Sequence, residues 1–177
     1  EAGLPARGLE PQGTDAASNS EATYGFINFA SPDGVGSVTI NGVAITVVGQ
    51  TFTTDLGVLT ITSIAPGRIG YDYLLTDNTT AASADFFAVA ITDTDGDTAS
   101  ATLRIGIIDD APIAAADTDL VGPADFTAET GNVLTGEGTT SGAAGADEEG
   151  ADGASVTGVY AGASGSFVEP GTVIQGL

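Results

Sequence analysis

The residues best suited to chemistry are the three carboxylates of one short run, Asp93-Thr94-Asp95-Gly96-Asp97, which alternate around a turn glycine. Carboxylates that converge repel one another unless a cation lies between them, and hard oxygen ligands of this kind suit calcium. The run does not continue as an EF-hand, because Thr98 stands where that loop needs its glycine and Arg104 where it needs a bidentate glutamate. The sequence therefore predicts a calcium site on a β-turn, with further ligands from elsewhere. The alternative is a solvated turn, since Asp and Gly favour turns in any case.

A second set of acids lies beyond the next predicted strand, at a junction, and comprises Asp109, Asp110, Asp117 and Asp119. We interpret this set as a second calcium site, with a plain charged linker as the alternative. The strand between the two sets, residues 98–108, would span roughly 35 Å when extended, so one ion cannot bridge both. The sequence thus predicts two separate sites at opposite ends of one domain. Three further acids, Asp72, Asp77 and Asp85, are expected near strand ends, where they could join either set.

The composition excludes several classes of function. The chain has 177 residues and a formal net charge of −21, from 24 acidic residues against three basic ones, all arginine. Nucleic acid and anionic membrane surfaces are therefore not expected as partners, because both need a basic face. The chain has no histidine and no cysteine, so it lacks the usual base and nucleophile at neutral pH, and we expect no enzyme.

The same composition bears on stability and location. Without cysteine no disulfide framework can form, and bound divalent cations are the simplest relief for so much negative charge. No apolar stretch approaches the roughly 20 residues of a transmembrane helix, so no membrane insertion by this segment is expected. No signal-peptide pattern opens the chain, so an export signal would lie outside this segment.

Short strands separated by turns must position the acids. They are predicted at residues 24–29, 37–40, 43–48, 52–54, 58–62, 69–75, 86–92 and 98–108. Asn41-Gly42 between two β-branched runs indicates a type I′ hairpin. Residues 98–108 alternate with period two, which indicates a half-buried strand. Its apolar positions are Ala99, Ala101, Leu103, Ile105 and Ile107. Since no helical periodicity is present, the sequence predicts an all-β fold, a β-sandwich. The aromatic residues expected in its core are Phe26, Phe29, Phe52, Tyr71, Tyr73 and Phe87.

A domain boundary is predicted at Pro112, which cannot continue a central strand. Residues 1–112 would form one sandwich, with residues 1–22 as a linker or an edge strand. Residues 113–177 would be the N-terminal part of a second sandwich, with a strand at 116–121, a solvated loop at 136–153 and β structure again at 155–159. Half a sandwich with open edges is unstable alone. We therefore expect the chain to belong to a longer tandem array, or its second unit to be completed by another chain.

Several stretches resemble a known group of proteins. ITDTDGDTA at residues 91–99, followed by IIDDAP at residues 107–112, resembles the end of one repeat in giant RTX-type bacterial adhesins secreted by type I systems. AADTD at residues 115–119 and GNVL at residues 131–134 resemble the start of the next repeat, which is cadherin-like and of the VCBS type. EAGLP at residues 1–5 is similar to the first-strand entry of such repeats.

The resemblance implies immunoglobulin-like extender repeats that stack end to end outside the cell, at the bacterial surface, with neighbouring repeats of the same chain as partners. It assigns Asp93, Asp95 and Asp97 to the repeat-end turn, and Asp109, Asp110, Asp117 and Asp119 to a calcium-stiffened linker. Residues 136–153 depart from the pattern, because they are longer and richer in Ala and Gly. We thus expect a non-enzymatic, calcium-stiffened extender of a secreted or surface-anchored adhesin. The alternatives are a filament or S-layer subunit that assembles with other copies by strand complementation, and a carbohydrate- or ice-binding domain.

Overall fold

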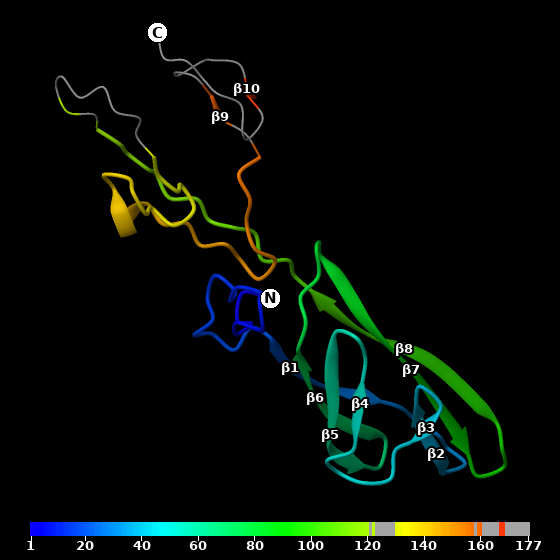
Figure 1. The fold of residues 1–177 in the computed structure, drawn as a ribbon. Coiled ribbons are helices and arrows are strands. Elements are labelled where there is room, and N and C mark those ends of the chain that lie inside the picture. The colour runs from blue at the N-terminus through cyan, green and yellow to red at the C-terminus, as the bar shows by residue number, and fades with distance from the viewer. Residues whose placement is uncertain (121, 123–129, 158, 161–166, 169–177) are drawn as a thin grey trace.

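A computed structural model describes residues 1–120, 122, 130–157, 159–160 and 167–168. The predicted all-β fold is confirmed, because two antiparallel four-stranded sheets stack as a sandwich (Figure 1). One sheet has the order β1-β6-β5-β4, and the other has the order β3-β2-β7-β8. The strands are β1 Ala22–Asn28, β2 Val35–Ile40, β3 Val43–Ala44, β4 Thr51–Thr53, β5 Gly57–Ala65, β6 Arg68–Leu75, β7 Ser83–Asp93 and β8 Thr98–Ile107.

The turn between β2 and β3 is the hairpin that the Asn-Gly pair predicted. Ile40 pairs with Val43. Asn41 and Gly42 have φ values of 50° and 79°, the left-handed region that both central residues of a type I′ turn adopt. β3 is shorter than the predicted strand at 43–48, because the Gln50 side chain takes the next backbone groups: it accepts the N–H of Thr46 at 2.9 Å and donates to the carbonyl oxygen of Ala44 at 2.8 Å.

The core lies between the two sheets. Phe87 is fully buried and meets Tyr73 edge to face, with 6.1 Å between ring centres. Of the aromatic residues predicted there, Phe52, Tyr71, Tyr73 and Phe87 are buried, and Phe29 packs against them partly buried. The prediction for Phe26 is wrong, because the alternation along β1 gives the inward place to Ile27. The Phe26 ring is 50% exposed and lies beneath the Arg68 guanidinium, 4.3 Å from its carbon.

β8 follows its predicted alternation only in its second half. Ile105 and Ile107 are buried, and Leu103 packs partly buried against the core. Ala99 and Ala101 are exposed. Among the residues that the structure describes, β8 is an edge strand with β7 as its only neighbour in the sheet, so its first half is covered from one side alone.

Residues 1–21 form turns and no strand, with one isolated bridge between Arg7 and Glu10. The segment is nevertheless attached to the sandwich. Leu4 is 1% exposed and belongs to the core cluster. The backbone nitrogen of Glu1 donates to the carbonyl oxygen of Ile108 at 3.1 Å, and Arg7 donates to the carbonyl oxygen of Thr76 at 2.8 Å. The segment therefore closes the end of the sandwich at which β6 and β8 finish.

Beyond Pro112 the described residues form few regular elements. They include one turn of 3-10 helix, η1 Gly142–Gly145, and the paired short strands β9 Val159–Tyr160 and β10 Phe167–Val168. The strand predicted at 116–121 is absent from residues 116–120, and residue 121 lies outside the described residues. Residues 155–157 are not a strand either. The prediction that 113–177 is an incomplete second repeat falls partly on residues outside the described ranges.

Candidate metal centres

The turn between β7 and β8 brings Asp93, Asp95 and Asp97 together. Carboxylate oxygens of the three residues all lie within 4.8 Å of one another. The hairpin sets this geometry, because Thr92 and Thr98 form its last pair and the N–H of Asp93 donates to the carbonyl oxygen of Asp97 at 3.0 Å. Gly96 has a φ of 104°, which a side chain would strain. Among the residues that the structure describes, no other three acidic side chains converge in this way.

Asp93 is the most firmly held of the three. Its Oδ1 accepts the backbone N–H groups of Asp95, Gly96 and Asp97 at 3.3, 2.9 and 2.8 Å. A hydrogen bond with the Asp95 side chain, together with these backbone donors, lowers the pKa of Asp93, although desolvation acts in the opposite direction. Asp95 and Asp97 are exposed. By donor type the group fits Ca²⁺, and the remaining ligands would have to come from water or backbone carbonyls.

The junction acids lie far from this turn. β8 begins at Thr98, directly after the turn, and ends at Ile107, directly before the junction. Because β8 pairs with β7 over its whole length, the turn and the junction occupy opposite ends of the sandwich (Figure 1). One ion cannot serve both, as the sequence predicted.

At the junction, Asp110 is buried and already hydrogen-bonded. Its Oδ2 accepts the backbone N–H groups of Thr14 at 2.8 Å and Ala151 at 3.2 Å, and its Oδ1 accepts the Thr14 hydroxyl at 2.6 Å. Burial by itself raises the pKa of Asp110, but these donors and the nearby N-terminal amine outweigh it, and the net pKa lies below the ordinary value. Asp110 therefore ties together the N-terminal segment, the end of β8 and the residues beyond Pro112.

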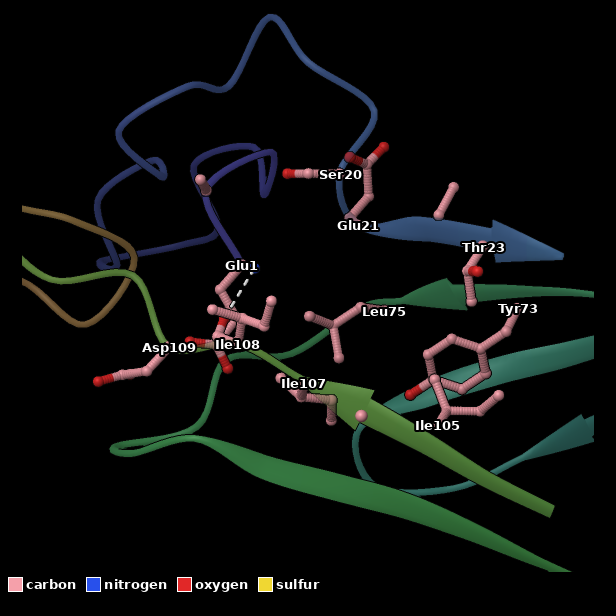
Figure 2. Close-up of a pocket in the computed structure, with 13 residues that line it drawn as sticks. Glu1, Ser20, Glu21, Thr23, Tyr73, Leu75, Ile105, Ile107, Ile108 and Asp109 are labelled. Atoms are coloured by element: carbon pink, nitrogen blue, oxygen red, sulfur yellow. Dashed lines mark hydrogen bonds between the residues drawn. The ribbon is translucent and has the colours of Figure 1, made fainter.

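Asp109 faces a different neighbourhood. Its Oδ1 is buried without a hydrogen-bond partner among the described residues, and the same holds for Oε2 of Glu1 and Oε2 of Glu21. The three residues line one cavity of about 300 Å³ (Figure 2). Figure 2 shows Glu21 on one side, Asp109 on the other and Glu1 between them. They do not form a convergent group like that of the β7–β8 turn.

Sequence reasoning missed Glu1 and Glu21, because both lie in the segment interpreted as a linker or an edge strand. Glu1 is 6% exposed, and its Oε1 accepts the N–H and the hydroxyl of Thr79, each at 2.7 Å. Glu21 directly precedes β1, and its carbonyl oxygen accepts the N–H of Leu75 at 2.8 Å. The available indication was position alone: the two acids flank the segment that carries Leu4.

Asp117 and Asp119, both beyond Pro112, bind hydroxyl groups of residues 140 and 141. Oδ1 of Asp117 accepts Ser141 Oγ at 2.8 Å, and Oδ1 of Asp119 accepts Thr140 Oγ1 at 3.0 Å. The same two hydroxyls accept the backbone N–H groups of Thr118 and Leu120, each at 3.1 Å, and these bonds take the place of strand pairing. The structure does not bring either residue into a group with Asp109 or Asp110.

The three acids expected near strand ends join neither set. Asp85 is buried and bridges elements of both sheets, since it accepts the hydroxyls of Tyr73, at 3.0 Å, and Thr54. Burial, and then the hydrogen bond and charge of Asp85, raise the pKa of Tyr73, so its hydroxyl remains a donor. Asp72 and Asp77 are exposed, and Asp77 lies 3.5 Å from Arg7.

No family model, no curated protein and no solved structure matches the chain. In the part of the chain that the structure describes, no helix is long and apolar enough to cross a membrane. The resemblance to RTX adhesin repeats therefore stays a prediction.

Proposed function

We propose that the chain is a calcium-stiffened structural repeat, a spacer in a secreted or surface-anchored bacterial adhesin, with no catalytic role. The observation that carries this proposal is the convergence of Asp93, Asp95 and Asp97. In a chain with a net charge of −21, three convergent carboxylates repel one another, and a bound divalent cation supplies the neutralising charge. Asp93 is already oriented by three backbone donors, so little rearrangement is needed.

A spacer also needs a junction that holds its segments in place, and contacts across the boundary support this. Asp110 joins Thr14 to Ala151, as described above. Nδ2 of Asn78 donates to the carbonyl oxygen of Ala151 at 3.0 Å and to the Asp152 side chain. Ile113 and Glu148 exchange backbone hydrogen bonds at 2.8 and 3.0 Å. The bonds of Asp110 and Asn78 connect the sandwich to the residues beyond Pro112, and the Ile113–Glu148 pair orders those residues directly after it.

The junction offers a second place for a cation. Glu1, Glu21 and Asp109 each keep a buried carboxylate oxygen without a partner among the described residues. A buried carboxylate oxygen without a partner is costly, and a cation in the cavity would offset that cost. Since the three carboxylates do not form a convergent group, a cation there would bind individual buried oxygens of the cavity and take its remaining ligands from water or backbone carbonyls.

Calcium titration by calorimetry, together with thermal unfolding in calcium and in chelator, tests the proposal. Binding to the folded state must raise the unfolding midpoint by an amount set by the ratio of calcium concentration to dissociation constant. Asp95→Asn should weaken binding at the turn by roughly tenfold or more, because it removes one carboxylate ligand. Asp109→Asn should weaken binding at the junction without affecting the turn.

Asp55→Asn is the matched control, because Asp55 is exposed on the β4–β5 turn and makes no side-chain hydrogen bond among the described residues. It removes the same charge away from both places and should leave binding unchanged. If the unfolding midpoint is the same in calcium and in chelator, the carboxylates at the turn are merely solvated and the calcium-stiffened spacer is ruled out.

A further inference from the structure

β8 is a long edge strand without the usual protection. It has ten residues, all paired with β7 without a bulge. On its other side it makes no backbone hydrogen bond with any residue that the structure describes. Natural edge strands are shortened, bulged, or interrupted by proline or charge. Of the other edge strands, β3 and β4 have two and three residues, and β1 has seven. β8 contains no proline and no acid, and Arg104 is its single charged residue.

The inward face of this edge is apolar and uncovered. Ala99, Ala101 and Leu103 of β8, with Ile27 of β1 and Ile91 of β7, line a groove of about 270 Å³. Ala99 and Ala101 are exposed, and the other three are only partly buried. The three β8 residues alternate with polar ones, as in a half-buried strand. The sandwich therefore leaves room for one more strand beside β8.

The charge distribution indicates which partner fits. Copies of a chain with a net charge of −21 repel one another over most of their surface. The two strands that flank the groove, β1 and β8, carry none of the 24 acids. This groove is therefore a face on which a second copy can approach without bringing carboxylates of those two strands together.

We propose that β8 pairs antiparallel with β8 of a second copy, in a dimer with two-fold symmetry. The part of β8 open to a partner is residues 98–104, because Glu1 and Ala2 line the cavity at its far end together with Ile105 and Ile107. The centre of this part is Ala101, so Ala101 of one copy faces Ala101 of the other.

This register also brings opposite charges of the two copies together. Arg104 of each copy lies opposite Thr98 of the other, directly after the acidic turn of residues 93–97. Each guanidinium is thus placed beside carboxylates of the other copy, and the two Arg104 side chains stay apart. The pairing closes on itself, since both copies use the same strand. It does not rest on calcium, so its test and that of the proposed function can fail separately.

The first test is the molar mass of the full chain in chelator, measured by sedimentation over a range of concentrations. The wild type should approach twice the monomer mass of 17.3 kDa as its concentration rises. Ala101→Glu should raise the dissociation constant at least about tenfold, because two like charges would face each other at the symmetry axis. Ala88→Glu is the control, because Ala88 is exposed on β7 and its substitution adds the same charge away from the edge. A wild type that stays monomeric, or two variants that behave alike, would overturn the proposal.

The second test fixes the register and does not depend on a charged substitution. The chain has no cysteine, so Ala101→Cys introduces one thiol per copy. Directly opposed residues in an antiparallel pair have Cβ atoms about 4.5–5.5 Å apart, close to the separation that a disulfide needs. Under mild oxidation Ala101→Cys should form a disulfide-linked dimer at least about tenfold faster than Ala88→Cys, because pairing raises the effective thiol concentration. Equal rates would show that the thiols meet by random collision and that β8 does not pair in this way.

Discussion

Asp110 keeps its charge in a buried place because donors from two distant segments face it. Its folded-state pKa is lowered, so the stability that it contributes is present above the unfolded-state value of about 3.9 and is lost as the pH falls through the folded value. We therefore expect the junction to hold at neutral pH and to loosen below about pH 4. Hydrogen exchange of the Thr14 and Ala151 amides, corrected for intrinsic rates, measures this directly.

Two variants test whether the protection of these amides depends on Asp110 or on a neighbouring acid. Asp110→Asn should lower protection of the two amides at neutral pH by about 1–3 kcal/mol, the usual cost of leaving a buried group without its partner. It should also abolish the loss of protection below about pH 4. Asp15→Asn, an exposed neighbour of Thr14, should change neither. Protection in the wild type that is the same at pH 7 and pH 3 would refute the role of Asp110.

The residue scale also shows which parts of the site a sequence can reveal. Asp93, Asp95 and Asp97 are neighbours in the chain, so their convergence follows from local turn geometry and was predicted correctly. Asp110 meets Thr14 and Ala151 across separations of 96 and 41 residues. No local pattern encodes such contacts, and for the same reason Glu1 and Glu21 were missed.

At the scale of elements, the β2–β3 turn depends on one backbone conformation. Gly42 has a φ of 79°, and a Cβ added there would meet nothing within 4 Å, so any cost of a side chain is purely conformational. We expect Gly42→Ala to lower the free energy of unfolding by about 1 kcal/mol, measured by urea denaturation. Gly106→Ala is the control, because Gly106 is extended and its new Cβ would meet only the mobile end of the Arg104 side chain. Equal effects of the two substitutions would show that this backbone conformation costs nothing.

The elements themselves were predictable where they depend on local pattern. Turn chemistry placed the β2–β3 hairpin, and period-two alternation identified β8. The exposure of Ala99 and Ala101 was not predictable, because it depends on β8 being the last strand of its sheet, which is a property of topology. The docking of residues 1–21 was likewise hidden, since their turn-rich composition does not reveal that Leu4 enters the core.

At the scale of the whole molecule, the charge of −21 can be relieved in two distinguishable ways. Monovalent salt screens every exposed pair of charges, with a Debye length of about 8 Å at 0.15 M. Calcium would act where carboxylates converge, at the turn of residues 93–97, or where they keep a buried oxygen without a partner among the described residues, in the cavity lined by Glu1, Glu21 and Asp109. Comparing calcium with monovalent salt at equal ionic strength therefore isolates the effect of calcium binding from that of screening.

Small-angle scattering of the full chain makes that comparison. We expect a larger maximum dimension in calcium than in chelator at the same ionic strength, because a stiffened junction keeps the chain extended. Magnesium should have a smaller effect, since it demands near-octahedral geometry and gives up its water reluctantly. Measuring Ala101→Glu alongside the wild type removes any contribution from pairing through β8. Scattering profiles of that variant that superimpose in calcium and in chelator would show that its length is set by the Asp110 contacts alone, and the chain would then be a spacer that needs no ion.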